Sequence, residues 1–469
     1  MNYQTELFHS LLNSFLNEDS ALMLTDGTVL AVRGSTPAIY GTLSAAATTA
    51  SKYLKLKEND VAILNDPYSG GTTLNEMIFI MAVSEDILWM RKVPLTENFA
   101  FAKSIEEEGL RIPPTPILMN GHINEMILGA MGAHPLCPSH LVDWVKGEIE
   151  KMQKAAKRLH ESIEFSGLQV TPEIISDYIS ASRTAAVNKI SDSASGETRV
   201  DVQLDSGELL RVSMEIHDGK INLDFSGTTA GKMTFLTESA VYGICFHAIS
   251  QFYKFTHLAN SGSFSTLQIV SPTVCWLNAK YPSPAYRGAT VGATALKNAI
   301  ELALSQIHSK TAVPITCGVS TQIQFESDAQ SSALQFDIGG GASNQQSGGA
   351  ATSSSVSIEK IEKGFPILIT EVKFKNASDE TFKQAGGRGV EFGVKAHSDI
   401  QLRWMTDLTA HSPRLPKSFV RKTITQFKVV DSKESEQVLQ AQGDTVLKKN
   451  TTFKLATECG ICFDKQSAT

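Results

Sequence analysis

The feature that most constrains the fold is a run of period-two alternation between residues 200 and 225. Apolar side chains occupy every second position in three segments, 200–204, 210–216 and 221–225. Asp-Ser-Gly and His-Asp-Gly turns separate these segments at 205–207 and 217–219. Because successive side chains of a strand point to opposite faces of a sheet, the pattern predicts an antiparallel meander with one buried face.

The chain is too long for a single hydrophobic core, because 469 residues exceed the ~250–300 at which single cores stop growing. A polar stretch at 191–198 is the best candidate for a boundary. We therefore expect an α+β fold of mixed, multi-domain type. Residues 1–190 would form an N-terminal α/β region, and residues 199–469 a β-rich antiparallel region with an embedded helix at 293–308.

Hydrophobic periodicity predicts the individual elements on either side of this boundary. Expected helices lie at 5–18, 42–54 and 145–163, the last with apolar residues at spacings of three and four. Expected strands lie at 21–24, 29–32, 61–64, 77–83 and 87–90, and later at 367–374, 390–394, 400–404 and 423–430.

The charge pattern argues against nucleic acid and membranes as partners. The formal net charge is −7, with 42 basic and 49 acidic residues and no long basic run. The longest apolar run, 77–83, is far shorter than the ~20 residues of a membrane-spanning helix, and the first residues do not resemble a signal peptide. Six cysteines are too sparse for a disulfide scaffold, so we expect a cytoplasmic protein. Charged residues make up only 19%, against about 25% in ordinary domains, which favours a stable protein partner.

Several catalytic and binding motifs are absent from the sequence. It contains no Walker phosphate loop and no Gly-x-Ser-x-Gly nucleophile elbow. The glycine-rich segments 339–342 and 386–389 lack a following helix, so we interpret them as turns. One cluster of possible metal ligands, His122, His134, Cys137 and His140, leaves open a zinc-like site.

Six segments, in order along the chain, resemble landmarks of one known family. They are residues 60–72 (with Asn-Asp-Pro-Tyr-Ser-Gly-Gly-Thr), 107–114 (with Glu-Gly-Leu-Arg-Ile-Pro-Pro), 224–228 (Asp-Phe-Ser-Gly-Thr), 277–284, 358–366 and 386–389. The chain is thereby similar to the hydantoinase B/oxoprolinase family, which includes B subunits of N-methylhydantoinase, 5-oxoprolinase, and acetone and acetophenone carboxylases. The resemblance implies that an ATP-using A subunit activates the substrate and that the B subunit completes ring opening or carboxylation.

The resemblance also implies a divalent metal, held by a His-Leu-Pro-Asp stretch after Gly-Gly-Thr and by a histidine on the next strand. The positions that match these ligands here are Thr73, Glu76 and Val93 or its neighbour Pro94. Another family histidine is replaced by Ile39. We select Val93 over Pro94 and expect its side chain to converge with those of Thr73 and Glu76 on adjacent strands. Threonine is a poor ligand and valine is none, so we expect no metal at these former metal positions.

Without a metal, the weak catalytic candidates are Asp66 and Glu76, because a carboxylate in a pocket can be tuned to act as acid or base. The Asn-Asp-Pro context favours a simpler role for Asp66 as a turn former. The expected function is a hydantoinase B-like subunit of an ATP-dependent cyclic amide hydrolase or carboxylase complex, with the metal site lost. The chain itself would carry no cofactor, and ATP would bind a hydantoinase A-like partner; self-association is the other option. A non-catalytic scaffolding or regulatory homologue and a metal-free biosynthetic enzyme remain as alternatives.

Overall fold

The structure is a computed structural model, and it describes residues 3–95, 102–308, 316–327, 330–343, 346–351, 358–375 and 382–463. The chain forms two compact units. The first consists of Met1–Glu197, Met214–Asp224 and Met233–Ala289, and the second of Thr198–Ser213, Phe225–Lys232 and Thr290–Thr469. The chain therefore passes between the units several times, whereas the sequence suggested one boundary at 191–198.

The first unit is built on a seven-stranded sheet of order β2-β1-β5-β4-β3-β6-β7, and all its strand pairs are antiparallel. The strands are β1 (Ser20–Leu24), β2 (Val29–Arg33), β3 (Val61–Leu64), β4 (Glu76–Ala82), β5 (Ile87–Pro94), β6 (Thr115–Met119) and β7 (His122–Ile123). The hairpin and the three following strands expected from hydrophobic patterning are confirmed.

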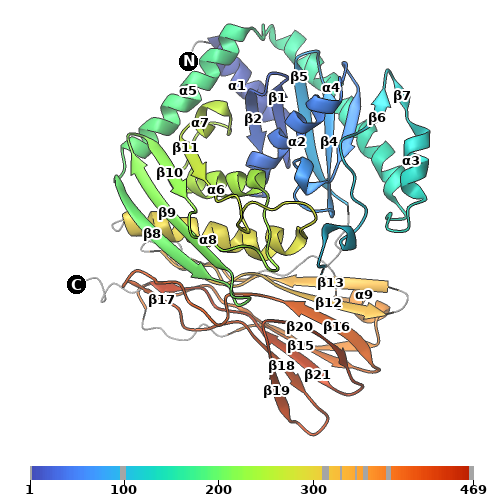
Figure 1. The fold of residues 1–469 in the computed structure, drawn as a ribbon, viewed down its shortest axis with the longest axis vertical. Helices are drawn as coiled ribbons and strands as arrows, with labels where there is room; N and C mark the ends of the chain where they lie inside the picture. Colours follow the sequence, from blue (N-terminus) through green and yellow to red (C-terminus); the bar gives the residue numbers. More distant parts are fainter. Residues whose placement is uncertain are drawn as a thin grey trace. The chain divides into compact units, whose positions relative to one another are not determined.

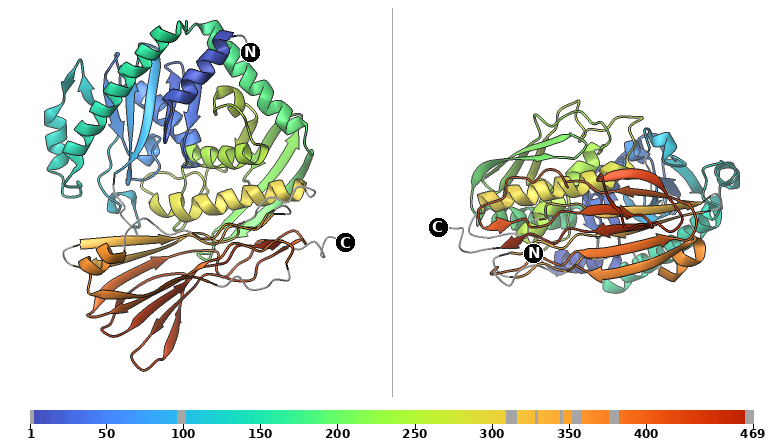
Figure 2. Two further views of the ribbon diagram at one scale, coloured as in Figure 1. Left: turned by 180° about the vertical axis from the view of Figure 1, so that it is seen from behind. Right: turned by 90° about the horizontal axis from the view of Figure 1, so that it is seen from below.

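Helices cover both faces of this sheet. On one face lie α1 (Tyr3–Phe15), α4 (Leu141–Ser166) and α5 (Pro172–Ser191) (Figures 1 and 2). Met77, Phe79 and Met81 of β4 pack in a core with residues of these helices. On the other face, helix α2 (Ile39–Tyr53) contacts β1, β2, β4 and β5. Central strands buried on both faces read as continuous apolar runs, which explains the run at 77–83.

A second helix crosses α2 at very short range. Helix α6 (Glu238–Tyr253) meets α2 at Gly41 and Gly243. A Cβ on Gly41 would lie 2.0 Å from the carbonyl oxygen of Ser239, and one on Gly243 would lie 2.3 Å from that of Ala38. Only glycine permits the two backbones to approach this closely. Other helices of the first unit are α3 (Glu125–Gly132), α7 (Ser261–Phe264), η1 (Pro67–Ser69) and η2 (Ile105–Glu107).

The predicted meander is confirmed as strands β8 (Gly196–Gln203), β9 (Leu209–His217) and β10 (Lys220–Asp224). They belong to a four-stranded sheet of order β11-β10-β9-β8, in which β11 (Leu267–Val270) runs parallel to β10. The burial of β10 alternates along the strand, with Ile221 and Leu223 inside.

In the second unit, two antiparallel sheets pack face to face. One has the order β13-β12-β16-β20 and the other β14-β15-β21-β18-β19. Phe325 and Leu402 of the first sheet share a core with Phe392, Phe427 and Phe453 of the second. The strands are β12 (Thr321–Ser327), β13 (Gln330–Phe336), β14 (Ile367–Phe374), β15 (Val390–Ala396), β16 (Ile400–Met405), β18 (Gln426–Val430), β19 (Glu436–Leu439), β20 (Gln442–Leu447) and β21 (Thr452–Ala456). Helices α8 (Ala293–Ile307) and α9 (Ile358–Gly364), the π-helical turn η3 (Gly288–Gly292) and the pair β17 (Phe419–Val420) and β22 (Cys462–Phe463) complete the elements.

The glycine-rich segments are more ordered than the turns expected for them. Gly340 donates its N–H to the carbonyl of Gly349, Gly387 donates to Gly340, and Gly460 donates to Gly387, each at 2.8 Å. A Cβ on Gly387 would lie 1.7 Å from the Gly349 carbonyl oxygen. The segments form a glycine bundle, defined here by these four residues, in which backbone packs directly on backbone. The local sequence did not indicate this, because Gly340, Gly387 and Gly460 lie far apart along the chain.

No helix within the described residues is long and apolar enough to cross a membrane.

Candidate functional site

The turn after β3 has little conformational freedom. Asp66 caps η1 by accepting hydrogen bonds from the backbone N–H of Tyr68 (3.1 Å) and the hydroxyl of Ser69 (2.9 Å). Gly70 has φ +106°, and a Cβ there would lie 2.2 Å from the backbone nitrogen of Ala46. Asp66 is therefore a turn-forming residue, the role that its Asn-Asp-Pro context favours.

Asn65 ties this turn to the segment that follows η2. Its side-chain amide donates to the carbonyl oxygens of Leu74 (3.3 Å) and Leu110 (2.9 Å), and its oxygen accepts from the N–H of Ile112 (2.6 Å). Asn65 is buried and cannot bind water, so these hydrogen bonds compensate for the loss of hydration of its amide.

Arg111 neutralises the carboxylate of Asp66. A guanidinium nitrogen lies 3.2 Å from Asp66 and another 3.3 Å from Glu106. The guanidinium also lies over the ring of Tyr281, 4.9 Å from its centroid. Because its carboxylate oxygens are already engaged by the N–H of Tyr68, the hydroxyl of Ser69 and the guanidinium of Arg111, Asp66 is a weaker catalytic candidate.

A third segment joins the same place. The hydroxyl of Tyr68 donates to the carbonyl of Ser283, and its ring meets that of Tyr281 edge-on at 6.0 Å. Burial, together with the nearby carboxylates of Glu108 and Asp66, raises the pKa of Tyr68. Three of the motifs that carry the family resemblance, at 60–72, 107–114 and 277–284, thus converge within the first unit. We call this convergence the motif junction.

Glu108 is the residue of the motif junction that sequence reasoning missed. One carboxyl oxygen accepts a hydrogen bond from the N–H of Tyr286 (2.9 Å), while the other is buried without a hydrogen-bond partner among the described residues. Burial raises the pKa of Glu108 to about 7. The N–H groups of Tyr286 and Ala285 act in the opposite direction and lower this pKa, but burial is the larger effect. The only signal in the sequence was its position in the Glu-Gly-Leu-Arg-Ile-Pro-Pro motif.

Glu76, the retained carboxylate of the former metal positions, is already paired. One oxygen lies 2.6 Å from Nζ of Lys92, and the other accepts a hydrogen bond from the hydroxyl of Thr72. The same Nζ lies 3.2 Å from Asp19. Because its charge is already compensated, Glu76 is also a weak candidate for acid–base work.

The strand register separates Val93 from Glu76. Glu76 pairs with Pro94 across β4 and β5, whereas Val93 pairs with Met77 and packs against the core on the opposite face. The expected convergence of Thr73, Glu76 and Val93 is therefore not found for Val93. Pro94 is the residue directly across from Glu76.

The side chains at this place do not fit the metal that the family resemblance implies. Pro94 and Ile39 offer no donor atom, and the ammonium of Lys92 lies between the available carboxylates, Asp19 and Glu76. Among the residues described by the structure, no group of three or more His, Cys, Asp or Glu side chains is arranged to hold a metal ion.

The histidine-rich segment forms no such group either. His122 is exposed on β7, and His140 contacts the carbonyl of Leu95 at 3.3 Å. The ring of His134 accepts a hydrogen bond from the N–H of Leu136, and the thiol of Cys137 donates to the carbonyl of Pro138. These four side chains act locally rather than around a common centre.

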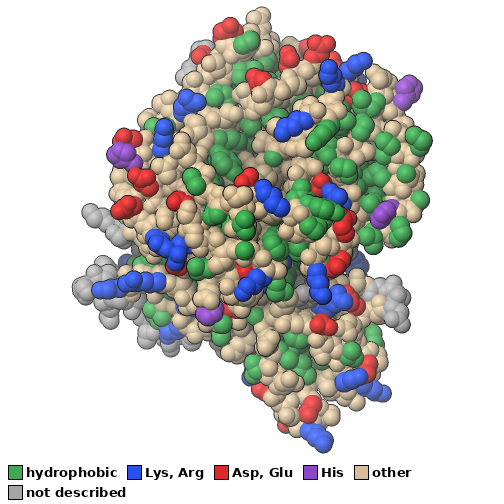
Figure 3. All heavy atoms as spheres, viewed as in Figure 1, with side chains coloured by type: hydrophobic (Ala, Val, Ile, Leu, Met, Phe, Trp, Pro, Cys, Tyr) green, Lys and Arg blue, Asp and Glu red, His purple; other side chains and the backbone are tan. Residues whose placement is uncertain are grey.

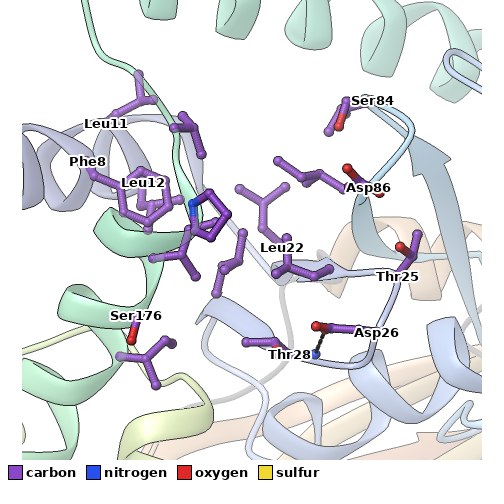
Figure 4. Close-up of a pocket in the computed structure, with 18 of the residues that line it drawn as sticks. Phe8, Leu11, Leu12, Leu22, Thr25, Asp26, Thr28, Ser84, Asp86 and Ser176 are labelled. Atoms are coloured by element: carbon purple, nitrogen blue, oxygen red, sulfur yellow. Dashed lines mark hydrogen bonds between the residues drawn. The ribbon is translucent and has the colours of Figure 1, made fainter.

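A separate cavity of about 880 Å³ opens in the first unit, between α1, α4, α5 and two hairpin turns (Figure 4). Its wall is mostly apolar, and the rim carries hydroxyl and carboxylate groups. The labelled lining residues are Phe8, Leu11, Leu12, Leu22, Thr25, Asp26, Thr28, Ser84, Asp86 and Ser176. This volume lies within the usual range for small-molecule pockets, and the lining suits an apolar group.

Acidic and basic side chains are interspersed on the face of the molecule shown in Figure 3. No large single-sign patch is visible on that face, and nucleic-acid binding would require an extended basic one.

Comparisons with known proteins agree with this architecture. The family model described as hydantoinase B/oxoprolinase matches residues 12–415. An uncharacterized protein of Methanocaldococcus jannaschii is 26% identical over 429 residues, which cover 85% of this chain and 76% of that protein. The crystal structure of ATP-dependent caprolactamase from Pseudomonas jessenii has a TM-score of 0.77 and 15% identity, covering 97% of this chain and 89% of that one. A nucleotide-free structure of acetone carboxylase has a TM-score of 0.75 and 13% identity, covering 98% and 73%.

The fold is thus shared with the caprolactamase and acetone carboxylase structures. This chain belongs to the hydantoinase B/oxoprolinase family. The α+β architecture expected from the sequence is confirmed by the same comparisons. At 13–15% identity the structural likeness concerns the fold alone.

Proposed function

We propose that this chain is the hydantoinase B-like subunit of an ATP-dependent complex that opens cyclic amides or carboxylates a related substrate, without a metal at residues 73, 76 and 93–94. The observation that supports this proposal is the contrast between two neighbouring places in one unit. At the motif junction, segments that resemble family landmarks are joined by a hydrogen bond and an ion pair. At the former metal positions, lysine, proline and isoleucine occupy or surround the place of the ligands.

The chain carries no cofactor of its own in this proposal. ATP is bound and used by a hydantoinase A-like partner, because the sequence contains no phosphate loop. Caprolactamase and acetone carboxylase, whose folds match, are both described as ATP-dependent. In this proposal the complex works in the cytoplasm, because its A-like partner needs ATP.

One observation favours a metal-free enzyme over a purely scaffolding homologue. Glu108 has a pKa near 7 and a carboxyl oxygen without a hydrogen-bond partner among the described residues. A carboxyl group that titrates near neutral pH can give and take a proton at the working pH. Among the acids at the motif junction, Glu108 is therefore a better candidate than Asp66.

The test is co-expression of the chain with hydantoinase A-like subunits, followed by co-purification and assay of ADP release. Candidate substrates are hydantoin, 5-oxoproline, caprolactam, and a ketone with bicarbonate. We expect a stable complex whose substrate-stimulated ADP release needs both chains. Elemental analysis of the complex should find no stoichiometric manganese, zinc or iron.

The outcomes of this test distinguish a metal-free enzyme from a scaffolding homologue. Glu108→Gln should abolish product formation by an otherwise intact complex, while Glu107→Gln, a change at the exposed neighbour, serves as the control. A complex that forms but leaves every substrate unchanged would favour the scaffolding alternative. One metal ion per chain would contradict the metal-free proposal.

A further inference from the structure

The ammonium group of Lys92 lies in a cage formed by two carboxylates. Its side chain is only 3% exposed, and Nζ lies 2.6 Å from Glu76 and 3.2 Å from Asp19. The backbone N–H of Lys92 also donates to the carbonyl of Asp19 at 2.8 Å. The lysine is thus fixed at both its backbone and its charged end.

A threonine hydroxyl donates a hydrogen bond to each of the two carboxylates. Thr36 donates its hydroxyl proton to Asp19, which also accepts from the N–H of Ser35 at 2.8 Å. Thr72 donates to the second oxygen of Glu76. Outer hydrogen bonds of this kind orient carboxylates toward a shared cation, as they do around metal ions.

The surroundings leave little room for another ligand. A Cβ on Gly34 would lie 2.2 Å from a carboxylate oxygen of Asp19 and 2.4 Å from the δ-methyl of Ile39. Ile39 is fully buried beside Asp19, and it occupies a position where the family resemblance implies a histidine. The cage is therefore closed on this side by an apolar group.

We propose that Lys92 is a built-in cation, whose ammonium group occupies the place where Asp19 and Glu76 would otherwise bind a divalent metal ion. The proposal depends on the proposed function at one point only, namely the divalent metal that the family resemblance implies close to these residues. Hard divalent cations such as Mn²⁺ and Mg²⁺ prefer carboxylate oxygens, and both carboxylates already point at one position. A fixed ammonium excludes such an ion by its charge and by its volume.

A simple structural ion pair is the competing explanation, and the two make different predictions. Both predict that removing the lysine destabilises the protein, because two partly buried carboxylates lose their counter-ion. Only the built-in cation predicts that the emptied cage binds a divalent ion, and that this binding depends on Glu76.

The experiment uses Lys92→Met, which removes the charge but keeps the length of the chain. Binding of Mn²⁺ is measured by the loss of the free-ion signal in electron paramagnetic resonance, and stability by the unfolding temperature with MnCl₂ and with EDTA. We expect Lys92→Met to bind one Mn²⁺ at least tenfold more tightly than the parent and to unfold at a higher temperature when Mn²⁺ is present. Lys92→Arg should behave as the parent does.

Two controls make the result specific. Lys92→Met combined with Glu76→Gln should lose the gained affinity, and Lys297→Met, which frees a single carboxylate, Glu301, should gain none. Lys92→Gln provides a second neutral variant if Lys92→Met does not fold. Failure of the folded neutral variants to bind more Mn²⁺ than the parent, or binding that persists after Glu76→Gln, would overturn the proposal. Complex formation with the A-type partner is measured separately on the parent. A parent that forms no complex would contradict the proposed function without affecting the Mn²⁺-binding result.

Discussion

At the scale of single residues, Glu108 gives the clearest dependence on pH. Its pKa is raised from 4.5 to about 7 in the folded chain, so the folded state binds this proton more tightly than the unfolded state does. Below about pH 4.5 the carboxyl is protonated in both states, and its burial then causes no pH-dependent loss in the free energy of unfolding. As the pH rises from 4.5 to 7, the cost of ionising a buried group lowers the free energy of unfolding.

We expect Glu108→Gln to remove this loss of stability. Between pH 4.5 and 8 the free energy of unfolding should fall more steeply in the parent than in the variant, by on the order of 2–3 kcal/mol. Urea unfolding followed by circular dichroism at several pH values measures the difference. Glu107→Gln should keep the slope of the parent, and an equal slope for Glu108→Gln would show that Glu108 is ionised in the fold at little cost.

The site residues show how far sequence reasoning reaches at this scale. The loss of ligands at Thr73 and Ile39 could be read directly, because each depends only on residue type. The choice of Val93 over Pro94 could not, because a shift of one residue in strand register moves a side chain to the other face of the sheet. Lys92 lies in the segment that matches the second family histidine, but residue type alone does not reveal that its ammonium group lies between Asp19 and Glu76.

At the scale of elements, strong periodicity made some segments predictable. The meander β8–β10 and helix α4 follow patterns that depend on neighbours in the sequence, and both are found. Helix α6 is buried nearly all round, so it shows no amphipathic pattern from which to predict it. Helix α5 is not among the predicted helices, although Thr171 and Pro172 form a standard helix start, with Thr171 accepting from the N–H of Ile174.

The glycine bundle supports a prediction with a matched control. In Gly387→Ala the new Cβ would lie 1.7 Å from the carbonyl oxygen of Gly349, and backbone atoms cannot yield as side chains do. We expect the free energy of unfolding to fall by more than about 2 kcal/mol, because the hydrogen bonds to Gly340 and Gly460 are disturbed.

The control for this change is Gly349→Ala, because a Cβ there meets no heavy atom within 4 Å. Its free energy of unfolding, measured like that of Gly387→Ala by denaturant titration, should stay within about 1 kcal/mol of the parent. Equal effects of the two alanines would show that the bundle tolerates side chains, and that the close packing of backbones at Gly387 contributes little to stability.

At the scale of the whole molecule, the low charged fraction of 19% leads to a prediction about assembly. We expect size-exclusion chromatography with light scattering to give a mass above the 50.8 kDa of one chain, either alone as a self-associated form or after mixing with the A-type subunit. Because few residues of the chain are charged, it can bury an extended surface against a partner, and the cores of interfaces are depleted in charge. A clean 50.8 kDa species that also ignores the A-type subunit would count against this expectation.

The sequence by itself determined the family, the order of motifs and the elements with strong periodicity, because these depend on residue type and on near neighbours. The tertiary structure decided which distant groups meet. Tyr68 donates to Ser283 across 215 positions of the chain, and Lys92 lies between Asp19 and Glu76, which belong to separate segments. Such contacts follow from sheet register and from the packing of helices on the sheet. No local pattern encodes them, since their free energy is gained only when the whole unit has folded.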